Sequence, residues 1–126
     1  MSETIAQNKA LAHRIYDEMW NKANPAVANE IFANPEGVQK AVSLFLAAFP
    51  DLRHTVEGMV AENDLITIRF SASGTHTGQW KEFAPSGKPI HYTGVTLARI
   101  ERGKIVDHHT WWDTMEVIEQ ITKETK

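Results

Sequence analysis

The first hydrophobic pattern of the chain has helical spacing and predicts an amphipathic helix close to the N-terminus. Its apolar stripe is carried by Ile5, Leu11, Ile15, Met19 and Trp20, with charged residues between them. Ser2 or Thr4 is the candidate N-cap of this helix. Because Pro25 disfavours helical geometry in the residue before it, the helix should end near residues 21–24, and a short helix should follow over Ala26–Phe32.

Two further helices are predicted, one before the strands and one after them. Asn34 and Pro35 have the residue types of an N-cap and a first-turn proline, and an apolar stripe follows them until Pro50 ends the helix. Asp113 is the candidate N-cap of the last helix. We expect the charged tail after that helix, Lys123–Lys126, to fray.

From Leu52 onward the pattern changes and predicts β-strands. The predicted strands are Leu52–Ala61, Leu65–Gly74, Pro89–Glu101 and Lys104–Trp112. Turn residues at 62–64 and 102–103 join two pairs of these strands as hairpins, which make antiparallel neighbours. Helices first and an antiparallel meander afterwards predict a single α+β domain over residues 1–126, with the helices covering one face of a curved sheet.

Composition and charge narrow the classes of partner. The 126 residues are 42% hydrophobic, enough for one core. With 13 basic and 16 acidic residues the formal charge is -3, so we expect neither nucleic acid nor a membrane as a partner. The absence of cysteine excludes disulfides, thiolate catalysis and cysteine-bound metal. Without a signal-like or membrane-spanning stretch, a cytoplasmic location is predicted.

Several short motifs occur in a recognisable order along the chain. They are Ala48-Phe49-Pro50-Asp51-Leu52, Gly74-Thr75-His76-Thr77-Gly78, Pro85-Ser86-Gly87-Lys88-Pro89 and Gly103-Lys104-Ile105-Val106, followed by His108. In this order and spacing the chain resembles the SnoaL-like polyketide cyclases, a branch of the nuclear transport factor two-like (cystatin-like) fold. The resemblance implies a cone-shaped antiparallel sheet with a deep apolar pocket and a homodimer. It implies no single reaction, because this fold hosts cyclases, isomerases, hydrolases and non-catalytic binding proteins.

The chain departs from the family at two places. A short segment that helps to line the family's pocket is missing between Phe32 and Asn34. On the last strand, Thr110 stands where the resemblance implies an aspartate that serves the cyclases as general acid and base. A threonine hydroxyl stays protonated at physiological pH, so the cyclase mechanism does not carry over.

Strand alternation selects candidate pocket residues. It places Val106, His108, Thr110 and Trp112 on one face of the last strand, which the resemblance turns towards the pocket. The same logic selects Tyr92 and Thr96 on the preceding strand. The candidate substrate-binding residues are Tyr92, Thr96, Thr110 and Trp112, with His76 and Tyr16 as further candidates. The alternative is that they are wall residues, buried for their area or favoured in strands.

The candidate catalytic residues are His108 and Asp113. A neutral imidazole at His108 can act as a base near pH 7. Asp113 is the displaced acid in this interpretation, or else only the cap of the last helix. His76 lies in a tight corner, where a backbone hydrogen bond is the competing explanation. The adjacent His108 and His109 point to opposite faces of a strand, so we expect no metal site, and no cofactor is expected.

Two functions from different classes remain. The first is an enzyme of cyclase, isomerase or hydrolase type that acts on a small, largely apolar molecule, with His108 moving a proton. The second is a non-catalytic ligand-binding or dimeric interaction domain. A homodimer is expected in both cases, because His109 and Trp111 alternate onto the outer face of the sheet, and aromatic residues are enriched at interfaces.

Overall fold

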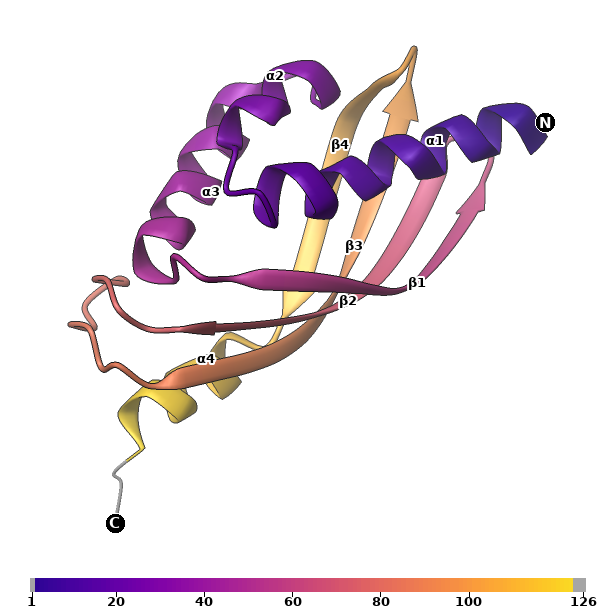
Figure 1. Cartoon of the computed structure of the whole chain (residues 1–126). Helices are drawn as coiled ribbons and strands as arrows, with labels where there is room; N and C mark the ends of the chain where they lie inside the picture. The colour runs from indigo at the N-terminus through magenta and orange to yellow at the C-terminus, as the bar shows by residue number, and fades with distance from the viewer. Residues whose placement is uncertain (1, 124–126) are drawn as a thin grey trace.

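The chain folds as helices packed on an antiparallel sheet, in a computed structural model that describes residues 2–123 (Figure 1). The helical segments are α1 (Ser2–Arg14), the π-helix η1 (Ile15–Trp20), the 3-10 helix η2 (Pro25–Val27), α2 (Ala28–Ile31), α3 (Pro35–Ala48) and α4 (Thr114–Thr122). The strands are β1 (Arg53–Glu62), β2 (Leu65–Thr75), β3 (Pro89–Glu101) and β4 (Lys104–Trp112). The predicted α+β architecture is confirmed.

The sheet has the order β1-β2-β3-β4, with every neighbouring pair antiparallel. β2 and β3 are long and strongly curved, and α1, α2 and α3 lie over the same face of the sheet (Figure 1). β3 alternates strictly, with every second side chain from Ile90 to Ile100 buried. A register shift between Val56 and Gly58 interrupts β1, and such bulges increase local bend and twist.

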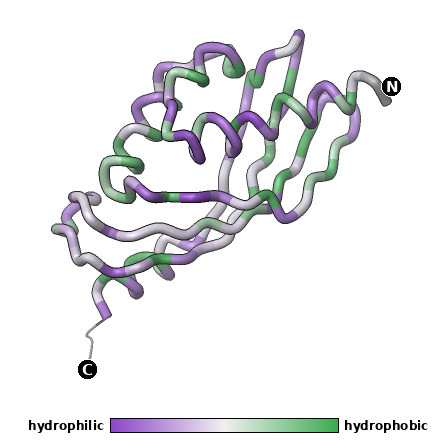
Figure 2. Tube along the Cα trace, viewed as in Figure 1, coloured by the Kyte–Doolittle hydropathy of each residue, from purple (hydrophilic) through white to green (hydrophobic). Residues whose placement is uncertain are grey.

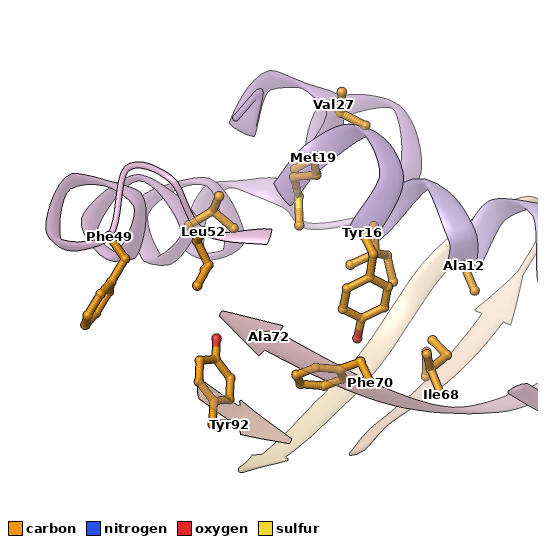
Figure 3. Packing of buried hydrophobic residues seen from close by; sticks show 14 of the residues in the cluster. Ala12, Tyr16, Met19, Val27, Phe49, Leu52, Ile68, Phe70, Ala72 and Tyr92 are labelled. Carbon is orange, nitrogen blue, oxygen red and sulfur yellow. The ribbon is translucent and has the colours of Figure 1, made fainter. Parts of the chain in front are cut away.

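The core fills the space between the helical layer and the concave face. Figure 2 shows the C-terminal end of α3 as a hydrophobic segment. Figure 3 shows Tyr16 reaching from the helical layer towards Phe70 on β2, while Tyr92 rises from β3 towards the helices. Phe49 and Ile68 are fully buried between these layers. The hydrophobic core therefore adjoins the aromatic residues that line the candidate site.

The last helix closes an edge that β4 leaves open. β4 ends at the pair Gly94↔Trp112, so the first residues of β3 have no β4 partner. The side-chain amide of Gln120 on α4 replaces that partner, accepting from the His91 N–H at 2.6 Å and donating to the His91 carbonyl at 2.8 Å. The predicted cap is confirmed, because the Asp113 carboxylate accepts from the Glu116 N–H at 3.0 Å.

The other predicted N-caps and the predicted tail lie at the N-termini of α3 and α1 and after α4. Asn34 occupies the predicted N-cap position of α3, and Pro35 lies in the first turn, but the Asn34 side chain makes no capping hydrogen bond. Thr4 lies inside α1 rather than at its cap, and the position before Ser2 lies outside the described residues. Of the tail predicted to fray, the structure describes Lys123 alone. Among the described helices, none combines the length and the apolar character needed to cross a lipid bilayer.

Candidate functional site

A π-turn in the first helical segment directs several side chains towards the sheet. The Asn21 N–H donates to the Tyr16 carbonyl at 2.8 Å, five residues back. This wider turn places four of its six residues on one cavity wall, namely Ile15, Tyr16, Met19 and Trp20. π-turns of this kind occur often at functional sites.

The cavity lies between the helices and the concave face of the sheet, with a volume of about 320 Å³. The remaining residues of its wall are Phe32, Val38, Ala41, Val42, Phe45, His54, Phe70, Tyr92, Thr96, His108, Thr110 and Trp112. Aromatic rings dominate this wall: the Phe45 ring meets those of Trp20 and Trp112 edge-on, with centroids 5.9 and 5.6 Å apart. Among the described residues, those that line the cavity include no Lys, Arg, Asp or Glu.

A chain of three hydroxyl groups crosses the polar part of the wall. The Tyr16 hydroxyl lies 2.7 Å from Thr96 Oγ1, which lies 2.8 Å from Thr110 Oγ1. Thr96 and Thr110 are direct partners across β3 and β4, which brings their hydroxyls together. Burial raises the pKa of Tyr16 to about 12, so its phenol stays protonated. Thr110 is exposed and is the last hydroxyl of this hydrogen-bonded series, and Thr96 is buried.

His108 contributes an imidazole to the same wall. Its ring packs against Phe32, with centroids 5.0 Å apart, and is half-buried. Burial lowers the pKa of His108 below its ordinary value, although the nearby Asp107 carboxylate opposes the shift. The imidazole is therefore neutral near pH 7 and able to accept a proton.

His54 supplies a second imidazole. It is 6% exposed and lies among the rings of Tyr16, Trp20 and Phe70, at centroid distances of 5.3, 4.9 and 5.2 Å. Its Nδ1 is buried with no hydrogen-bond partner within residues 2–123. Burial lowers the pKa of His54 to about 4, so the ring is neutral over the physiological range.

Comparisons with known proteins agree with this architecture. The family model for SnoaL-like polyketide cyclase matches residues 10–121. The chain belongs to the SnoaL-like polyketide cyclase family. A comparison with curated protein sequences finds no significant match.

Solved structures of similar fold include three from bacteria. A candidate SnoaL-like polyketide cyclase from Jannaschia sp. CCS1 is 21% identical, with a TM-score of 0.87, covering 95% of this chain and 94% of its own. AclR, a candidate hydroxylase from Streptomyces galilaeus, is 22% identical with a TM-score of 0.85, covering 97% and 85%. IdmH, a candidate polyketide cyclase from Streptomyces antibioticus, is 25% identical with a TM-score of 0.80, covering 91% and 98%.

The fold of this SnoaL-like protein brings most of the predicted site residues together. The cavity wall contains Tyr16, Tyr92, Thr96, His108, Thr110 and Trp112. Burial raises the pKa of Tyr92 well above its ordinary value, so this phenol is also neutral. The roles assigned to these residues stay predictions.

Two predicted site residues lie away from the cavity wall. His76 is fully buried beyond it, where Nδ1 accepts from the Ser86 N–H at 3.2 Å and lies 2.9 Å from Ser86 Oγ. This arrangement holds the loop between β2 and β3. Asp113 is exposed, and its carboxylate caps α4. Neither side chain is positioned to contact a molecule in the cavity.

His54 lies in the cavity wall, although it was not among the pocket residues predicted from the sequence. Alternation along the first predicted strand was the available signal, because Leu52 and His54 fall on the same face and both are buried. Within residues 2–123, no three His, Asp or Glu side chains lie close enough to hold a metal ion. His54 therefore adds to the cavity wall a neutral imidazole whose Nδ1 is unpaired among the described residues.

Proposed function

We propose that this SnoaL-like protein binds a small, neutral, largely apolar molecule in the cavity, and that His108 transfers a proton to or from it. The observation that carries the proposal is the wall itself, whose described residues hold two imidazoles and four hydroxyl groups but no charged side chain. A cavity of about 320 Å³ is at the lower end of the range for ligand sites.

The absence of charged side chains from the described wall restricts the net charge of the ligands that can bind. An ion that enters a low-dielectric cavity loses its hydration and needs an opposite charge as compensation. The described wall offers no such charge, and its imidazoles and phenols are held neutral by burial. Carboxylates, phosphates and ammonium ions are therefore disfavoured, while neutral ring compounds are favoured.

The aromatic rings favour a flat ligand. Trp20, Phe45 and Trp112 present faces and edges around one space, and aromatic pairs gain energy from offset or edge-on contacts. A neutral mono- or bicyclic aromatic molecule would use these contacts.

His108 is the residue that we propose as the proton-transfer group. A neutral imidazole can take a proton from an acidic C–H or O–H of the ligand and return it at another atom, as an isomerase requires. Tyr92, Thr96 or Thr110 would hold an oxygen of the ligand. The aldol cyclase mechanism is not proposed, because Thr110 occupies the position where the family resemblance implies an acid.

A non-catalytic ligand-binding function is the second candidate. It is favoured by His108 itself, because no side chain among residues 2–123 forms a hydrogen bond that would orient its ring. Catalytic imidazoles usually have such an orienting partner. Binding and turnover therefore need separate measurements.

The binding proposal is tested with two probes of similar shape and different charge, 2-naphthol and 2-naphthoate, by equilibrium dialysis at neutral pH. We expect 2-naphthol to bind and 2-naphthoate to bind at least about tenfold more weakly, because its carboxylate has no countercharge in the wall. Ala41→Trp should block the cavity, whereas the control Ser43→Trp lies on the same helix outside the wall. Equal binding of both probes, or equal effects of the two variants, would contradict the proposal.

We also propose a homodimer through the outer face of the sheet. Trp111 is 57% exposed and is the cross-strand partner of Val95, which is 36% exposed. Leu97, also 36% exposed, pairs with His109 two positions further along the strands, on the same face. These side chains form an apolar patch whose self-association would remove it from water.

A further inference from the structure

The hydroxyl groups of Tyr16, Thr96 and Thr110 form one hydrogen-bonded chain from the helical layer to the exposed part of the cavity wall. The two oxygen–oxygen distances are 2.7 and 2.8 Å. Each hydroxyl carries one hydrogen, so each can donate once and accept from others. The direction of donation along the chain is therefore decided by what its two ends can do.

The Tyr16 end fixes that direction. Tyr16 is 3% exposed, and within residues 2–123 its hydroxyl has Thr96 as its one hydrogen-bond partner. If Tyr16 accepted from Thr96, its own O–H would have no acceptor among the described residues, which is an unfavourable arrangement for a largely buried hydroxyl. The favoured arrangement is therefore the one in which Tyr16 donates to Thr96 and Thr96 donates to Thr110.

The Thr110 end is where the chain meets the cavity. Thr110 is exposed and forms part of the wall. Its oxygen accepts from Thr96, so its own hydrogen points elsewhere and can be donated to a ligand. A phenol is a stronger donor than an aliphatic hydroxyl, and successive hydrogen bonds in a low dielectric polarise one another, which strengthens the final donor.

We infer that Thr110 donates this hydrogen bond to a carbonyl oxygen, and that the ligands of the cavity are neutral cyclic ketones or related carbonyl compounds. The inference rests on the proposed function, because it assumes that the cavity takes a neutral molecule. A carbonyl oxygen has lone pairs and no hydrogen, so it matches a site that ends in a donor. A carboxylate would match the donor too, but the described wall holds no charge to compensate it.

The residue type at position 110 is central to this specificity. A carboxylate there would accept hydrogen bonds rather than donate them, and would repel a carbonyl oxygen. Threonine gives the position one oriented donor, held by its cross-strand partner Thr96. The same hydroxyl would also stabilise negative charge that develops on the carbonyl oxygen when a base such as His108 removes a neighbouring proton.

The test compares 1-indanone with indane, two bicyclic probes that differ in the carbonyl group. Dissociation constants are measured by equilibrium dialysis for wild type, Thr110→Val, Thr110→Ser and Tyr16→Phe. Thr110→Val keeps the branched shape and removes the hydroxyl, so it should weaken 1-indanone by about 3- to 10-fold and leave indane unchanged. Thr110→Ser should retain the affinity of wild type for 1-indanone, and Tyr16→Phe should weaken 1-indanone less than Thr110→Val does.

The infrared carbonyl frequency of bound 1-indanone gives a second readout. In wild type it should be lower than in hexane, because a hydrogen bond weakens the C=O bond. If the frequency equals that in hexane, or if Thr110→Val affects both probes alike, the carbonyl assignment is overturned while the proposed function stands. If neither probe binds to wild type, both are overturned. Should Thr110→Val fail to fold, Thr110→Ala makes the same deletion.

Discussion

The side-chain amide of Asn21 forms two hydrogen bonds with the backbone of His54. Its nitrogen donates to the His54 carbonyl at 2.8 Å, and its oxygen accepts from the His54 N–H at 2.7 Å. Asn21 follows the π-turn, so this pair ties the turn to β1. The imidazole of His54 is thereby held inside the cavity wall, where it makes the stability of the fold depend on pH.

Stability should fall as the pH is lowered from about 6.5 to about 4. The folded-state pKa of His54 is lowered to about 4 from an ordinary value of 6.5, so between these values the unfolded chain binds more protons. Acid therefore favours unfolding, by about 2 kcal/mol at pH 5. Burial also lowers the pKa of His76, which adds to the effect in the same direction.

Urea unfolding at pH 7.5, 6 and 5 measures this dependence. His54→Phe keeps a ring among the neighbouring aromatic residues and removes the titrating group, so its stability should change less with pH than that of wild type. His91→Phe is the control, because His91 is exposed on β3. An unchanged pH dependence in His54→Phe would show that His54 does not titrate as described.

Glycine at two turns should be needed for its backbone conformation. Gly87, in the loop before β3, and Gly103, in the turn between β3 and β4, have φ values of 72° and 77°, in the left-handed region that favours glycine. Replacing either residue by Val should lower the free energy of unfolding by about 1 kcal/mol or more, since a β-branched residue is strained there. Thermal melting measures the change.

A third glycine provides the control. Gly37 lies within α3, and a Cβ added there would meet nothing within 4 Å. Gly37→Ala should therefore raise stability, by up to about 1 kcal/mol. If all three substitutions lowered the melting temperature equally, the turn conformations would not be the cause.

The proposed homodimer should appear in light scattering at micromolar concentration as twice the mass of 14.2 kDa. Trp111→Arg places a charge in the apolar patch of the outer face and should shift the mass to that of the monomer. Ser43→Arg, on α3, should leave the dimer intact. A monomeric wild type would refute the proposal.

Thr110 should prevent aldol closure of polyketide esters. Such closure needs a group that removes a carbon-bound proton and one that protonates the new alkoxide, and a general acid or base contributes typically about 10² to 10⁴ in rate. Threonine donates a hydrogen bond but does not cycle a proton. Wild type should therefore show no turnover of a polyketide methyl ester, and Thr110→Asp should gain some.

His108→Ala completes that comparison. If wild type and His108→Ala both turned over the ester readily, then closure would not require an acid at position 110, and His108 would not be the catalytic residue. Activity that is found in Thr110→Asp alone supports the interpretation of position 110.

The strands were predictable because their signals are local. Turn residues and alternation placed the β3 and β4 segments at Pro89–Glu101 and Lys104–Trp112, the bounds that the structure shows. Alternation also placed His108, Thr110 and Trp112 on the face that lines the cavity.

Features that depend on distant contacts were not predictable in this way. The π-turn is one of them. The apolar residues around Tyr16 keep ordinary helical spacing, so the sequence pattern does not mark the wider turn. The buried position of His54 depends on helices that pack over β1, and the contact between His76 and Ser86 depends on the path of the intervening loop. Residue type alone does not show whether a histidine faces a cavity or supports a loop.

A crystal structure of the protein soaked with 2-naphthol would show whether the uncharged cavity binds neutral ring compounds. We expect the naphthol ring between Trp20, Phe45 and Trp112, with its oxygen near His54, His108 or Thr110. A ring bound at the outer face around Trp111, or a cavity that stays empty at saturating concentration, would contradict this expectation.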